Sequence, residues 1–151
     1  MTKSRFEQIK LLAVILLAGC LTQIATDIYA PSVLAVSKFF KSDISLVQFS
    51  MAIYLFGVAA AQLIFGPLSE GYGRKKPLLV GMIIMFFGSL ICLFAQSIEQ
   101  LIWGRFVQGI GAGAGAALWR TIFRDVYSGD ELAKYGSYLS VFITFIIPIA
   151  P

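Results

Sequence analysis

The sequence lacks histidine, has only two cysteines and is poor in charge, and each shortage excludes a class of protein. Histidine is the commonest metal ligand and the usual general base near neutral pH. Cys20 and Cys92 both fall in apolar runs, without the paired spacing of a zinc or redox site. No nucleophile stands beside a credible base either. We therefore expect no enzyme activity, no metal, no disulfide and no cofactor.

Hydrophobic residues are abundant instead. They make up 58% of the 151 residues, charged residues only 13%, and the mean hydropathy is +0.84. A soluble domain is about a quarter charged, and no aqueous fold of this size could bury so much apolar surface. The net charge of +4 comes from basic residues in short loops, so we expect a lipid bilayer and not nucleic acid as the partner.

Five apolar runs lie at about residues 9–30, 49–67, 77–95, 101–119 and 135–151. Runs of about 20 apolar residues cross the hydrocarbon core as helices, which predicts an all-α integral membrane protein. The last run is somewhat short for a crossing and stops within apolar sequence. We therefore expect a fragment of a larger transporter. The alternative is a complete five-helix protein.

Lysine and arginine are distributed unevenly between the two sides of these spans. Two of the 12 lie on the far side and one lies within a span. The asymmetry predicts that the N-terminus is cytoplasmic, because loops on that side are enriched in Lys and Arg. The remaining nine lie on the side of the N-terminus: Lys3, Arg5, Lys10, Arg74, Lys75, Lys76, Arg120, Arg124 and Lys134.

Two charged residues fall inside apolar runs, Asp27 in the first and Arg105 in the fourth. Such a residue costs roughly 2.5–3.5 kcal/mol at the centre of a membrane helix, so it is retained facing a partner or a wet cavity. Gln23 shares a helix face with Asp27, and Gln108 shares one with Arg105. Both charges lie in the outer half of the bilayer, which favours an ion pair or a competition for Asp27. A pair that only fixes packing, or an Asp27 hydrated at the interface, are the alternatives.

Two short patterns resemble other kinds of site. Leu17–Cys20 follows a basic start, as in a lipoprotein signal, but several further spans come after it. The glycine run includes a G-x-G-x-x-A pattern, but it lies inside an apolar run and not between a strand and a helix. Glycines four apart favour close helix packing instead. The packing glycines are Gly109, Gly111, Gly113 and Gly115.

The loop after the second span resembles the cytoplasmic signature of the major facilitator superfamily, G-x-L-S/A-D/E-x-x-G-R-K/R. It also has that family's position between the second and third spans. In this chain the signature consists of Gly66, Leu68, Ser69, Glu70, Gly73, Arg74 and Lys75.

Further motifs resemble one branch of that family. Arg105–Gly111 is similar to the R-x-x-Q-G-x-G pattern of the drug/proton antiporters, and Thr26–Pro31 to the T-D-M-Y-L-P stretch of Bcr/CflA multidrug efflux proteins. The same subfamily is matched at Gly57–Gln62, Arg124–Asp125 and Pro148–Pro151. Together these motifs cover nearly the whole chain.

This resemblance implies a twelve-helix antiporter built from two halves of inverted repeats, with substrate near the midplane. The chain would supply helices one to four and most of five, and the C-terminal half would be absent. The implied function is proton-driven export of small lipophilic drugs across the bacterial inner membrane. The proton gradient would be the energy source.

The resemblance also assigns roles to residues. Asp27 would be the protonatable group and Arg105 the arginine that tunes it. Cavity-lining residues would be Gln23, Tyr29, Tyr54 and Gln108. A cytoplasmic latch would involve Glu70 with Arg74; from its place in the loops, Glu70 can pair with Arg74 or with Arg124. Two departures weaken that latch, because the usual Asp is Glu70 and Gly71 stands where the family has Arg.

Two other functions are open at this stage. A facilitator that imports sugars or organic acids would share the loop signature, though not Thr26–Pro31 or the pattern beginning at Arg105. A small membrane protein that binds a partner without transporting anything is the second alternative.

Overall fold

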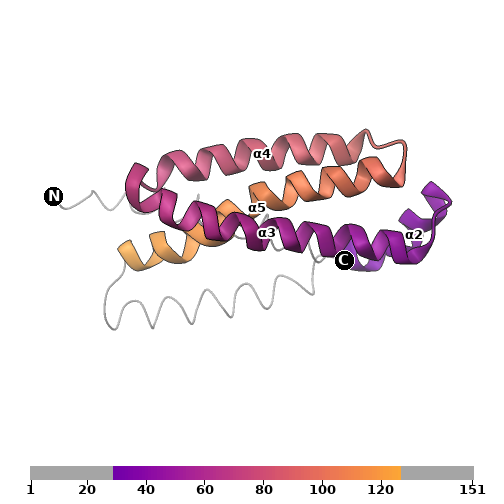
Figure 1. Ribbon diagram of the computed structural model, residues 1–151, viewed down its shortest axis with the longest axis horizontal. Coiled ribbons are helices and arrows are strands. Elements are labelled where there is room, and N and C mark those ends of the chain that lie inside the picture. Colours follow the sequence, from indigo (N-terminus) through magenta and orange to yellow (C-terminus); the bar gives the residue numbers. More distant parts are fainter. Residues whose placement is uncertain (1–28, 127–151) are drawn as a thin grey trace.

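The computed structural model describes residues 29–126, and this part of the chain is helical, without strands. Its helices are α2 (Tyr29–Phe40), α3 (Ile44–Tyr72), α4 (Lys75–Leu93) and α5 (Ile98–Val126). Figure 1 shows the three long helices side by side, with α2 at the end where α4 turns into α5. The predicted all-α fold is therefore confirmed.

The helix α2 corrects the predicted end of the first span near residue 30, because the chain is helical through Phe40. A Schellman-type turn ends it. Lys41 adopts a left-handed φ of 49°, and the Ser42 N–H donates to the Ser37 carbonyl at 3.1 Å. The Ser37 hydroxyl also donates to the Ser42 carbonyl at 2.7 Å. Polar residues that were expected to form a loop therefore close the helix.

The end of α3 is a second correction. The predicted span stopped at Pro67, but the helix continues through this proline to Tyr72. The reversal lies at Gly73, whose φ of +80° is a conformation that side-chain-bearing residues rarely adopt. The next helix, α4, then begins at Lys75, two residues before the predicted start at Pro77. A proline in the first turn is tolerated because its missing N–H would have no intrahelical acceptor.

The helices extend beyond the predicted spans because hydropathy marks only the part that lipid covers. At 1.5 Å per residue, the 29 residues of α3 are about 43 Å long, against about 30 Å of hydrocarbon. Within residues 29–126, α3 and α4 are long and apolar enough to cross a membrane. The helix α5 is equally long but less apolar, and much of it is buried against the other two.

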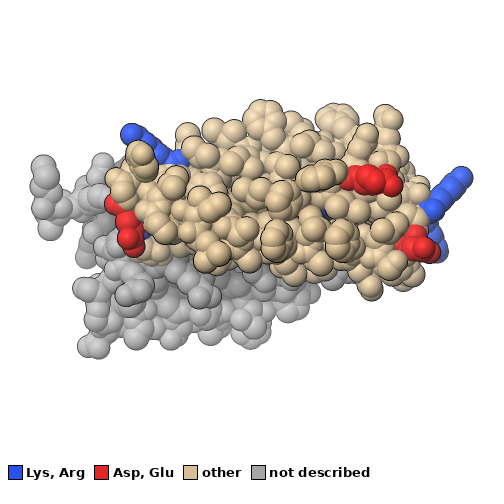
Figure 2. Space-filling model, in the orientation of Figure 1, with Lys and Arg blue, Asp and Glu red and all other residues tan. Residues whose placement is uncertain are grey.

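The surface has the pattern of a membrane protein. In Figure 2 the acidic and basic side chains gather toward the two ends of the described part, with a broad uncharged band between them. Large apolar side chains are exposed on every long helix, for example Leu63 (80%), Phe86 (61%) and Trp103 (67%). Exposed apolar surface of this extent suits contact with lipid.

Close backbone contacts hold α5 against α3 and α4. A Cβ on Gly57 of α3 would lie 2.8 Å from the Phe106 carbonyl oxygen, and a Cβ on Gly109 would lie 3.0 Å from the Tyr54 carbonyl carbon. On the other side, a Cβ on Gly111 would lie 2.6 Å from the Gly81 carbonyl oxygen. Only hydrogen fits at these positions, so the glycine run packs in both directions and brings side chains from three helices together.

Candidate functional site

Arg105 lies half-buried on α5, and its guanidinium group is held by aromatic rings from two other helices. Its Cζ lies 3.7 Å from the centre of the Tyr29 ring on α2 and 5.8 Å from that of Tyr54 on α3. Both rings are almost fully buried. A cation over a ring face gains about 0.5–2 kcal/mol, with the larger values where water is excluded. This contact offsets part of the cost of placing Arg105 within the apolar part of the bundle.

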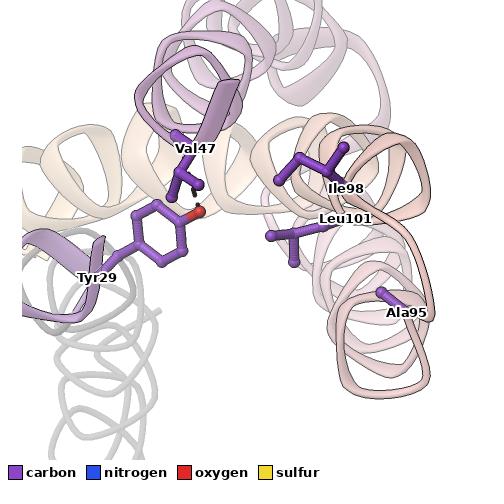
Figure 3. Close-up of a cluster of buried hydrophobic side chains, with 5 residues drawn as sticks. All are labelled: Tyr29, Val47, Ala95, Ile98 and Leu101. Atoms are coloured by element: carbon purple, nitrogen blue, oxygen red, sulfur yellow. Dashed lines mark hydrogen bonds between the residues drawn. The ribbon is translucent and has the colours of Figure 1, made fainter. Parts of the chain in front are cut away.

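The Tyr29 ring is itself fixed by hydrogen bonds to α3. Its hydroxyl lies 2.5 Å from the Ser50 hydroxyl, which donates to the Val47 carbonyl at 2.6 Å. Since the Ser50 proton is used in that bond, Tyr29 is the donor to Ser50. Tyr29 also lies 3.5 Å from the same Val47 carbonyl (Figure 3). A buried hydroxyl without partners would cost free energy, so these bonds keep the ring in place under the cation.

Apolar packing completes this end of the molecule. Tyr29 belongs to a buried cluster that joins α2, the start of α3 and the α4–α5 turn, and that includes Val47, Ala95, Ile98 and Leu101 (Figure 3). The start of α5 is capped within the same turn. The Gln100 N–H donates to the Ser97 hydroxyl at 3.3 Å, and the Gln100 side chain accepts from the Gln96 N–H at 2.8 Å. The helix that carries Arg105 is therefore anchored just before it.

A second set of hydrogen bonds links Arg105 to α4. Its Nη1 donates to Oε1 of Gln108 at 3.1 Å, and Nε2 of Gln108 donates to the Ser89 hydroxyl at 2.9 Å. Ser89 in turn donates to the Met85 carbonyl at 2.8 Å. Arg105 thus contacts groups from α2, α3 and, through Gln108, α4.

The structure brings together three residues that the resemblance placed at a cavity. Tyr29, Tyr54 and Gln108 all surround Arg105, while Asp27 and Gln23 lie outside the described residues. The predicted pair of Asp27 with Arg105 therefore stays a prediction. Ser50 and Ser89 were missed by the sequence analysis. A signal for Ser89 existed, because it is an isolated hydroxyl in an otherwise apolar stretch of α4.

The loop signature after the second predicted span forms a separate site at the other end of α3. Arg74 donates through Nη1 to the buried Ser69 hydroxyl at 2.6 Å, and Ser69 donates to the Gly66 carbonyl at 2.7 Å. Glu70 is exposed. Leu68 is also exposed, Lys75 opens α4, and Arg124 lies in α5 with a side chain outside the described part. The structure thus shows a hydrogen bond between Arg74 and Ser69, and the latch role stays a prediction.

Comparisons with known proteins agree with these features. A family model described as Major Facilitator Superfamily matches residues 15–151. The chain is 43% identical over 126 residues to the uncharacterised MFS-type transporter YdgK of Bacillus subtilis, covering 83% of this chain and 31% of that protein. It is 31% identical over 147 residues to multidrug resistance protein D of Escherichia coli, covering 97% and 37%. A bicyclomycin resistance protein homolog of Haemophilus influenzae is 32% identical over 125 residues, covering 83% and 30%.

The chain spans about a third of the length of these relatives. The resemblance to multidrug transporters of the Bcr/CflA type that the motifs indicated is confirmed. With a helical fold, two helices suited to a bilayer and a family match over nearly its whole length, the chain belongs to the Major Facilitator Superfamily of membrane transporters.

Proposed function

We propose that this chain is the N-terminal part of a proton-coupled transporter that exports small lipophilic molecules across the bacterial inner membrane. Relatives carry names such as multidrug resistance protein D, MdtL and MdtM, which supports drug export as the direction and substrate class. The cytoplasmic N-terminus is part of the same proposal and is supported by the uneven distribution of Lys and Arg.

One observation carries the proposal, namely a cation held over the Tyr29 ring at 3.7 Å within an apolar bundle. Asp27 precedes Tyr29 by two residues, and covalent geometry limits the separation of their Cα atoms to about 7 Å. The proposal places the Asp27 carboxylate close enough to interact with the Arg105 guanidinium group. A nearby cation favours the ionised carboxylate, and protonation would weaken that attraction. An acid with two charge states beside a fixed cation is the minimum that proton coupling needs.

Substitution of Asp27 in the whole transporter tests this proposal. Cells expressing the Asp27→Asn variant should retain a lipophilic dye as cells without the transporter do, while wild-type cells export it. An uncoupler should abolish the wild-type export. The Asn side chain has nearly the size of Asp but stays neutral, so a loss of export would show that the change of charge at Asp27 is required.

Asp43→Asn is the matched control. Asp43 is exposed between α2 and α3 and makes no side-chain capping bond to α3, so its substitution should leave export unchanged. Full, uncoupler-sensitive export by Asp27→Asn at normal membrane levels would contradict the proposal. Uptake of sugars or organic acids in place of dye export would instead favour an importer.

A further inference from the structure

We propose that Ser89 of α4 is a positioning residue that sets the direction of the Arg105 guanidinium group through Gln108. The inference rests on the proposed function, in which Arg105 acts on Asp27. It concerns a residue of α4 that is linked to Arg105 of α5 through the Gln108 side chain.

Ser89 stands alone in its helix. Apart from the two lysines at its start, α4 consists of apolar residues, glycines, a proline and a cysteine, with Ser89 as its single hydroxyl. A polar side chain within such a helix is stabilised only if it finds partners inside the protein. Ser89 has two, the Met85 carbonyl in its own helix and the Gln108 side chain in α5.

The direction of these hydrogen bonds determines how the Gln108 amide is oriented. A serine hydroxyl has one proton, and Ser89 donates it to the Met85 carbonyl at 2.8 Å. Toward Gln108 it can therefore only accept, which selects the amide NH2 as its neighbour at 2.9 Å. The carbonyl end of the amide must then point to Arg105, where it accepts from Nη1 at 3.1 Å. The reverse orientation would direct two N–H groups at a cation.

Close packing of the α4 and α5 backbones sets the distance between Ser89 and Gln108. Gly88 is buried, and a Cβ there would lie 2.6 Å from the Gln108 Cα. The backbones of α4 and α5 are thus in contact one residue before Ser89. Because the helices meet here, the backbones of Ser89 and Gln108 cannot move apart without separating the helix pair. The distance between the two residues is therefore set by the packing of the helix pair.

The experiment uses the whole transporter in detergent, labelled with 15N-arginine, and follows the side-chain Nη signals by NMR. A guanidinium group whose Nη1 is restrained should give separate Nη signals, and loss of a signal in Arg105→Lys assigns it. Ser89→Ala should merge the Arg105 signals, whereas Ser89→Thr, which keeps the hydroxyl and can still donate to the preceding turn, should preserve them. Dye export should fall about fivefold in Ser89→Ala, the size of one hydrogen bond, and recover in Ser89→Thr.

Ser45→Ala is the control, since Ser45 is exposed at the start of α3 and should change nothing. If Ser89→Ala does not fold, Ser89→Cys fills the same space with a weak acceptor and should also merge the signals. Separate Arg105 signals in the folded Ala or Cys variant would overturn the proposal, as would merged signals in Ser89→Thr. Failure of the proposed function would look different, because dye export would survive Asp27→Asn while the NMR result stood by itself.

Discussion

Substituting Gly109 by alanine should separate α3 and α5 and destabilise the bundle. The new Cβ would lie 3.0 Å from the carbonyl carbon of Tyr54 and 3.2 Å from its Cα, and it would also collide with its carbonyl oxygen. These atoms belong to the backbone and cannot rotate away. The helices would have to move apart, along a contact to which Gly57 also contributes a close approach from the α3 side.

The expected loss of stability in Gly109→Ala can be estimated from measured effects of overpacking in other proteins. Forcing an extra carbon into a close-packed contact typically costs about 1–3 kcal/mol, which for a protein of this size class corresponds to a drop of several degrees in Tm. Thermal unfolding of the detergent-purified transporter, followed by fluorescence-detected size exclusion, would measure it. Because Tyr54 lies next to Arg105, we also expect dye export to fall.

Gly71→Ala is the matched control, because Gly71 lies in the last turn of α3 with nothing within 4 Å of an added Cβ. There alanine should be neutral or stabilise the helix by up to about 1 kcal/mol. Equal Tm values for Gly109→Ala and Gly71→Ala would refute the close contact between α3 and α5.

Two further predictions concern the end of the bundle where α2 meets the α4–α5 turn. Tyr29→Phe keeps the ring under Arg105 but loses the hydroxyl that bonds to Ser50, so it should lower the free energy of unfolding by about 1 kcal/mol in a thermal assay, whereas Tyr29→Leu should also impair dye export. Hydrogen bonds from the backbone and from Ser97 at the start of α5 hold the pKa of Glu99 below its usual 4.5. The ionised Glu99 carboxylate therefore stabilises the fold above pH 4.5, and this stabilisation disappears as the pH falls through the lowered pKa. Glu99→Gln should therefore reduce Tm at pH 7 but not in strong acid, and an equal reduction at both pH values would contradict this assignment.

Much of the fold could be predicted from the sequence because bilayer physics leaves few choices. Long apolar runs must be helical in lipid, and short loops must reverse the chain, so the existence of the helices over residues 49–67, 77–95 and 101–119 followed directly. Their ends could not be predicted in the same way. Hydropathy changes at the membrane surface, whereas a helix ends where its hydrogen bonding ends, as at Gly73 and not at Pro67.

The candidate site was predicted in part. Arg105 was identified by its cost in lipid, and Tyr29, Tyr54 and Gln108 by resemblance, because a charge in an apolar run is visible without coordinates. Ser50 and Ser89 were not identified. A single serine in a membrane helix commonly bonds only to its own preceding turn, and nothing in the sequence shows that its free lone pair meets another helix.

The sequence by itself determined that this chain is helical, that it lies in a membrane and that Arg105 needs partners there, since composition and the cost of charge in hydrocarbon settle these points locally. Only the tertiary structure decided which partners Arg105 has. Arg105 contacts the rings of Tyr29 and Tyr54 and the Gln108 amide, which bonds to α4. These groups come together because glycine contacts let the helix backbones approach closely. Contacts of this kind depend on the rotation and crossing of helices that are distant in sequence, and a local sequence pattern does not specify either.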